Sequence, residues 1–242
     1  MASYRRALAQ ALVDAGRGRE AAEAFLEAAE GRPAKEALEF RRKAGEQYLL
    51  SGHIPEGLLE LEGVLREVGL SMPASHRIAI PSLLLRRWGR RLRGLGFKRR
   101  EVSLVPPLQL ARIDTCWSAS AGLSMWDPVR GAYFQARHLD LALKAGEPGR
   151  IARALSFEAA YSATSGLKAH ARTEPLILKG KALAEEVQTP YILGLNHMST
   201  GLARFLEGRW RLAHQELRQA DVLLRERCRG VAWELDMAHI YD

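Results

Sequence analysis

The sequence predicts an all-α protein in which antiparallel helix pairs stack one after another as an α-solenoid. Alanine, leucine, arginine and glutamate dominate the chain, and β-branched residues are sparse. Apolar residues return every three or four positions along nearly all of it, which is the helical period. Glycine- or proline-containing breaks separate the periodic segments, so we expect many short helices. At 47% apolar content, 242 residues suffice for a sizeable core.

The first predicted helix pair lies near the N-terminus. Residues 3–15 place Tyr4, Leu8 and Leu12 on one stripe. Glycines then interrupt the pattern, and residues 20–30 resume it around Phe25. Two short helices joined by a tight turn are expected.

The second predicted pair covers residues 38–69. Its first helix carries Tyr48, the break falls at Gly52, and the second helix carries Leu61 and Leu65. The spacing of small and large apolar residues is therefore the same as in the first pair.

The two pairs resemble the tetratricopeptide repeat. Gly16 and Gly52 lie 36 residues apart, close to the period of about 34 residues of that repeat. Small residues at its fixed places let neighbouring helices approach closely, and large residues fill the remaining gaps. The matching places are Leu8, Ala9, Leu12, Ala21, Phe25, Ala28 and Pro33 in the first unit, Ala44, Gly45, Tyr48, Gly57, Leu61, Val64 and Gly69 in the second, and Gly201, Gly208, Ala213, Leu217 and Ala220 in a third, where Arg204 stands at the tyrosine place.

Three regions are expected: repeats over 1–72, a basic insert over 73–106, and further degenerate and tetratricopeptide-like pairs over 107–242. In the last region, residues 107–124 pair with 128–145, and 150–165 pair with 168–187. Proline at 128, 148 and 190 suits the first turn of a helix. A final helix begins after Cys228 and the chain ends inside it, so we expect the last repeat to be incomplete and the chain to be a piece of a longer protein.

The basic insert concentrates the charge of the chain. Between Ser71 and Arg100 there are nine basic residues and no acidic one. Removing these nine charges from the net charge of +8 leaves about −1 elsewhere. Any electrostatic function is therefore expected in this segment and not along the whole chain.

Residues 77–100 predict a basic amphipathic helix. Leu84, Trp88, Leu92 and Leu95 fall within about 80° on a helical wheel, and arginines point away from them. In the structural interpretation the apolar stripe packs on the solenoid, and the arginines are solvated or paired with acidic neighbours. In the functional one the helix docks an acidic protein partner, an anionic membrane or a nucleic acid. The candidate binding residues are Arg86, Arg87, Trp88, Arg90 and Arg91.

An aromatic cluster follows the insert. Trp117, Trp126, Tyr133 and Phe134 gather around Cys116 in the sequence. We favour a role in the core of the central helix pair. The alternative is a peptide-binding groove, for which Trp117, Trp126 and Tyr133 are the candidates.

No catalytic motif has its required context. Residues 16–21 spell a dinucleotide-binding string, but they follow a predicted helix and not a strand. His138 to Asp140 echo a kinase catalytic loop without its asparagine, and no phosphate-binding loop or nucleophile elbow occurs. The histidines lack metal-ligand spacing. We expect no enzyme activity, cofactor, metal or small-molecule substrate.

The cysteines, the apolar runs and the N-terminus indicate in which cellular compartment the protein is expected. Cys116 and Cys228 lie far apart and predict buried thiols without a disulfide. We find no apolar run of membrane-spanning length and no secretory signal. The protein is therefore expected to be cytoplasmic.

Several strings extend the resemblance beyond single repeats. They are residues 44–48, 51–53, 92–95, 112–114, 122–125, 127–128, 208–210, 225–228 and 230–235. Together they resemble the C-terminal repeat region of large bacterial multidomain serine/threonine kinases, which combine a kinase domain, a signalling NTPase domain and helical repeats. That resemblance implies regulation or scaffolding, with a protein partner or the upstream kinase and NTPase domains bound. We expect a protein-interaction scaffold, with a nucleic-acid- or membrane-associated regulator acting through helix 77–100 as the alternative.

Overall fold

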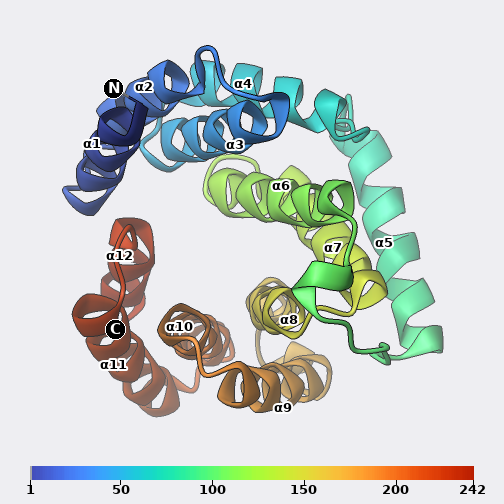
Figure 1. Ribbon diagram of the computed structural model, residues 1–242. Coiled ribbons are helices and arrows are strands. Elements are labelled where there is room, and N and C mark those ends of the chain that lie inside the picture. Colours follow the sequence, from blue (N-terminus) through green and yellow to red (C-terminus); the bar gives the residue numbers. More distant parts are fainter. Residues whose placement is uncertain (1) are drawn as a thin grey trace. The chain divides into compact units, whose positions relative to one another are not determined.

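The computed structural model describes residues 2–242, with side chains from residue 4 onward. Within this range every regular element is a helix, so the all-α prediction is confirmed (Figure 1). The α-helices are α1 Ala2–Asp14, α2 Gly18–Ala29, α3 Ala34–Leu50, α4 Ile54–Glu67, α5 His76–Arg93, α6 Pro107–Leu123, α7 Pro128–Ala145, α8 Pro148–Ala163, α9 His170–Val187, α10 Pro190–Leu206, α11 Trp210–Arg227 and α12 Ala232–Tyr241, and the short 3₁₀ turns are η1 Val102–Leu104 and η2 Gly166–Ala169.

The helices form two compact units. Unit 1 contains residues 1–96 and 105–141, and unit 2 contains residues 97–104 and 142–242. The basic stretch 73–106 is thus divided, because α5 belongs to unit 1 and residues 97–104 belong to unit 2.

Helix boundaries follow the local chemistry of the sequence. Gly16 and Gly52 adopt φ of +69° and +84° just after α1 and α3, a conformation that glycine adopts without steric cost. Pro148 and Pro190 open α8 and α10, where the missing N–H has no helical partner to lose. Glu147 caps α8 by accepting hydrogen bonds from the backbone N–H groups of the next turn. These predicted breaks fall at helix ends, but the helix predicted over 77–100 ends at Arg93, where Gly94 adopts φ of +73°.

Glycines let the helices of unit 1 approach closely. Consecutive helices from α1 to α4 pack on one another, and α6 packs on α3 and α4. A Cβ at Gly57 would lie 2.6 Å from Cγ of Leu49, and one at Gly45 would lie 3.2 Å from the backbone N of Leu61. Leu49 and Leu61 are both fully buried. Any side chain at either glycine would have to displace neighbouring core atoms.

Unit 2 repeats this packing. Helix α8 packs on α9, and α10 packs on α11. A Cβ at Gly201 would lie 2.5 Å from Cγ of Leu217, and one at Gly194 would lie 2.7 Å from Cδ2 of Leu224. Both leucines are buried. Helix pairs in both units are therefore held at a separation that only glycine permits.

Residues 97–104 pack as a strap on unit 2. The backbone N–H of Arg100 donates to the carbonyl of Gly146 at 2.9 Å. Arg99 pairs with Glu186, and Nζ of Lys179 lies 5.3 Å from the ring centroid of Phe97. Part of the basic stretch is thus engaged within the fold, in agreement with the structural interpretation of its charges.

The packing at Gly201 generates a stability prediction. We expect Gly201→Ala to lower the free energy of unfolding by about 1–3 kcal/mol, because its Cβ must displace Leu217. Gly89→Ala is the matched control, since a Cβ there meets only the tip of Arg93 at 3.4 Å and both positions gain the same helical propensity. Thermal and denaturant unfolding followed by circular dichroism measures the difference. Equal stability of the two variants would contradict the packing argument.

Candidate partner-binding surface

Helix α5 packs on α7 through a face that contains arginines. Ala79 and Leu83 are buried on this face, and so is Arg90 at 8% exposure. Nη1 of Arg90 donates to the carbonyl of Ala136 at 2.8 Å and to Oδ1 of Asp140 at 3.0 Å. These two bonds offset part of the desolvation cost of burying the guanidinium.

Arg86 shares the same acidic partner. Its Nη1 donates to Oδ2 of Asp140 at 3.0 Å, so one carboxylate binds two arginines of α5. At the other end of the helix, Nε2 of His76 lies 3.0 Å from Oδ1 of Asp127. Two of the five candidate residues of the basic helix, Arg86 and Arg90, therefore fasten α5 to α7.

Most of the large apolar residues of α5 lie on its outer face, whereas Leu83 is buried. Leu84 is 59% exposed, and Leu85, Trp88 and Leu92 are each more than 60% exposed. The interpretation in which this stripe packs on the solenoid is wrong. The face of α5 that contacts α7 carries Arg86 and Arg90. The stripe of Leu84, Trp88 and Leu92 is therefore left facing outward.

Five exposed apolar residues form what we call the outer seam of α5: Ile78, Pro81, Leu85, Trp88 and Leu92. They follow one another at intervals of three and four residues, the spacing by which one helix presents a continuous stripe to another. Ser82 and Gly89 lie along one edge of the seam, and Leu84 and Arg91 lie along the other. The seam is a helix-docking pattern that faces away from the core.

The charge around the outer seam has a single sign. No acidic residue occurs between Val68 and Arg100. Arg77, Arg91 and Arg93 are exposed on α5, and Arg87 is half-buried. The surface therefore combines apolar area with positive charge.

The aromatic cluster does not form a groove. Trp117 is 4% exposed and Tyr133 is 8% exposed, so both belong to the core, as the favoured interpretation predicts. Tyr133 meets Phe134 edge-on at 5.2 Å, and its hydroxyl accepts a hydrogen bond from Arg137 at 3.0 Å. Tyr133 belongs to a core cluster with Leu49 and Cys116, and the centroid of the Trp117 ring lies 5.8 Å from that of His138, so neither ring is exposed to a partner.

Trp126 is the exception in this cluster. It is 58% exposed, and its indole N–H donates to the carbonyl of Leu49 at 3.2 Å. One edge of the ring is thus fixed while the remainder contacts solvent. A single tryptophan in a turn gives no groove.

Neither cysteine is activated for chemistry. Burial raises the pKa of Cys116 to about 12, and burial likewise raises the pKa of Cys228. Because the thiolate is the nucleophile and the metal ligand, both side chains are unreactive near neutral pH.

A buried ion network ties α3 to α6 in unit 1. Nη2 of Arg42 donates to Glu39 at 2.6 Å, Nη1 donates to Glu46 at 2.9 Å, and Ser118 joins the same contact. Burial alone lowers the pKa of Arg42, but the hydrogen bonds and charges of Glu39 and Glu46 outweigh it, so the pKa is raised. The network stabilises the charged guanidinium and gives no site for a substrate.

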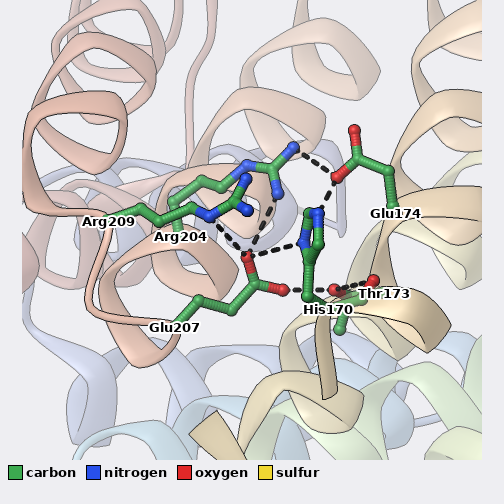
Figure 2. Close-up of polar contacts among 6 residues, drawn as sticks. All are labelled: His170, Thr173, Glu174, Arg204, Glu207 and Arg209. Carbon is green, nitrogen blue, oxygen red and sulfur yellow. Dashed lines mark hydrogen bonds and ion pairs between the residues drawn. The ribbon is translucent and has the colours of Figure 1, made fainter. Parts of the chain in front are cut away.

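A second network fixes the end of α10 to the start of α9 in unit 2 (Figure 2). The side chain of Glu207 is fully buried at its centre. Its Oε2 lies 3.1 Å from Nη1 of Arg204, 3.3 Å from Nδ1 of His170 and 3.9 Å from Nε of Arg209, and Thr173 donates to Oε1. Nη2 of Arg204 lies 2.7 Å from Oε2 of Glu174. From the sequence, Arg204 is noted only as a departure from the repeat pattern, and no contact is predicted among these residues, which lie up to 39 positions apart.

The electrostatics of Glu207 indicate a structural role. Burial raises its pKa, but the Thr173 hydrogen bond and the charge and hydrogen bond of Arg204 outweigh burial, so the pKa is lowered. A catalytic acid would require the opposite shift. Glu207 is therefore charged at neutral pH and orients its neighbours.

Comparisons and searches for special sites give no assignment. Within residues 2–242, no group of three or more His, Cys, Asp or Glu side chains is arranged to hold a metal ion. No helix in the described part of the chain combines the length and apolarity needed to cross a membrane. No family model, curated protein or solved structure matches the sequence.

The network around Glu207 generates a pH prediction. We expect Glu207→Gln to destabilise unit 2 by about 3 kcal/mol near pH 7, because it removes the negative charge that is paired with the nearly buried Arg204. The folded pKa lies below the ordinary value of 4.5, so the wild-type stabilisation is complete above that pH and is lost as pH falls through the folded value. The difference between wild type and variant should therefore shrink as pH is lowered from about 6 to about 3.

Thermal unfolding at several pH values measures this difference. Glu226→Gln, at an exposed position of α11, is the control and should change the melting temperature little at any pH. A constant difference between Glu207→Gln and wild type across the pH range would contradict the role given to Glu207.

Proposed function

We propose that this chain is a tetratricopeptide-like interaction module that binds a protein partner through the outer seam of α5. The observation that carries the proposal is that α5 packs on α7 through Arg86 and Arg90 and exposes a stripe of leucine, isoleucine and tryptophan. Exposed contiguous apolar stripes on soluble helices are typical of binding surfaces. Tryptophan and arginine are also the residues that most often dominate binding energy.

The remainder of the fold supports binding and not catalysis. The buried ion networks around Arg42 and Glu207 are engaged in joining helices. Both cysteines have raised pKa values, which does not favour nucleophilic chemistry. We therefore propose a scaffold without a reaction of its own.

The resemblance to bacterial kinase repeat tails favours a signalling role. In such a protein the partner would be a separate regulatory protein or the upstream kinase and NTPase domains. We propose that the module acts in the cytoplasm by holding one of these near the repeats.

The alternative of a nucleic-acid- or membrane-associated regulator is less well supported. It depends on the arginines of 77–100, yet Arg86 and Arg90 are engaged by Asp140 and Arg99 by Glu186. Phosphate binding would also leave the outer seam exposed to water.

A capture experiment with matched variants tests the proposal. The full chain is immobilised and exposed to nuclease-treated lysate of the source organism at low and high salt. We expect the double variant Leu85→Asp/Leu92→Asp to lose retained protein by at least about ten-fold, because each buried leucine contributes about 2 kcal/mol.

The control is Leu59→Asp/Leu178→Asp, which places the same charges on exposed leucines of α4 and α9. It should retain the same proteins as wild type. Identical capture by all three chains would contradict the assignment of the outer seam, and loss of capture on nuclease treatment would favour nucleic acid instead.

A further inference from the structure

Helix α5 stands apart from the pairing of its neighbours. In α1 with α2, α3 with α4, α8 with α9 and α10 with α11, consecutive helices pack directly on each other. After α5, the only regular element in residues 94–106 is the short turn η1, so α5 is not followed directly by a second α-helix (Figure 1). Ile78 is 57% exposed and Trp88 is 61% exposed, so the described part of the chain leaves the seam largely uncovered.

The outer seam has the dimensions of a helix-docking stripe. Its residues alternate at three and four positions over the length of α5, which places them along one line of the helix surface. Ser82 and Gly89 border that line, and their small size would allow another helix to approach closely. The intrachain packing does not require glycine at position 89, because a Cβ there would meet only the flexible end of Arg93.

The charge around the seam restricts the occupant. With no acidic residue from Val68 to Arg100, two copies of α5 facing each other would bring arginines together, which disfavours a symmetric dimer. An occupant with acidic side chains beside its apolar face would instead pair with Arg77, Arg91 and Arg93.

Other anionic occupants fit less well. A helix that lies in a membrane surface has a charged face opposite its apolar face, whereas the opposite face of α5 is packed on α7 with Arg86 and Arg90 bound to Asp140. A nucleic acid gains its affinity from phosphate contacts and has no use for an apolar stripe.

We propose that the outer seam of α5 binds an amphipathic α-helix of a protein partner whose apolar face is flanked by Asp or Glu. This inference rests on the proposed function and specifies the chemistry of the partner. The bound helix would lie along α5 and complete a helix pair. Its leucine-type side chains would cover Leu85, Trp88 and Leu92, and its carboxylates would face the exposed arginines.

Synthetic peptides of about three heptads test the proposal directly. The first carries leucine at the a and d positions and glutamate at e and g, so that repulsion between its own copies keeps it monomeric. The second has lysine in place of each glutamate. The third has the composition of the first in a scrambled order without an apolar face.

Binding of each fluorescent peptide to the full chain is measured by anisotropy. We expect the acidic amphipathic peptide to bind at least about ten-fold more tightly than either the lysine or the scrambled peptide. Leu85→Asp/Leu92→Asp should weaken its binding by at least about ten-fold, whereas Leu59→Asp/Leu178→Asp should change it by less than about two-fold.

Gly89→Leu separates docking from folding. The added side chain should obstruct the seam and weaken peptide binding by about ten-fold, while the melting temperature stays the same or rises because leucine favours a helix more than glycine does. Unchanged peptide affinity in this variant would contradict close helix–helix packing at the seam.

The remaining outcomes overturn the inference. Equal binding of the acidic and scrambled peptides would show that charge alone acts. Sedimentation of the chain with phosphatidylserine-containing vesicles, lost in Leu85→Asp/Leu92→Asp, together with no peptide binding, would make a lipid surface the occupant. If no peptide binds but capture from lysate still depends on the seam, the docking function stands and the acidic helix is rejected as its occupant. If capture is also independent of the seam, both proposals fail.

Discussion

Close approach of neighbouring helices is the constraint on which the structure depends. The two units meet this constraint in the same way, because a glycine leaves room for a buried leucine where two helices cross. The pairs are Gly57 with Leu49 in unit 1 and Gly201 with Leu217 in unit 2. The leucine fills the gap that the missing side chain leaves, so the contact is both close and well packed. Repetition of this contact lets short helices, individually unstable, form a continuous core.

Buried charges complete the packing without creating reactive sites. Arg42, Arg90 and Glu207 each sit at a helix contact, and each is engaged by groups from another helix. Such networks orient neighbouring helices more than they add net stability, because desolvation offsets much of the attraction. These charges are therefore engaged in joining helices within each unit.

In helix α5, a partner that is distant in the sequence decides which face of the helix is buried. Asp140 forms ion pairs with both Arg86 and Arg90, so the face that carries them can pack on α7. Once that face is covered, the leucines and Trp88 have only the outside available to them. An apolar surface on a folded chain is costly to leave in water, and this is why the seam is better explained as a binding surface than as a solvated one.

The sequence by itself determined the helices, most of their boundaries and several of the crossing residues, although the helix predicted over 77–100 ends at Arg93. Proline at 148 and 190, glycine at 16 and 52, and the helical period act within a few positions, so they are readable without coordinates. The spacing of Ile78, Leu85 and Leu92 was also present in the sequence, although only part of the seam was recognised from it. Only the tertiary structure decided which face of α5 is covered, that Trp117 and Tyr133 are core, and that Glu207 gathers four partners. Those outcomes depend on residues tens of positions away, and helical periodicity defines two faces without specifying which one meets a neighbour.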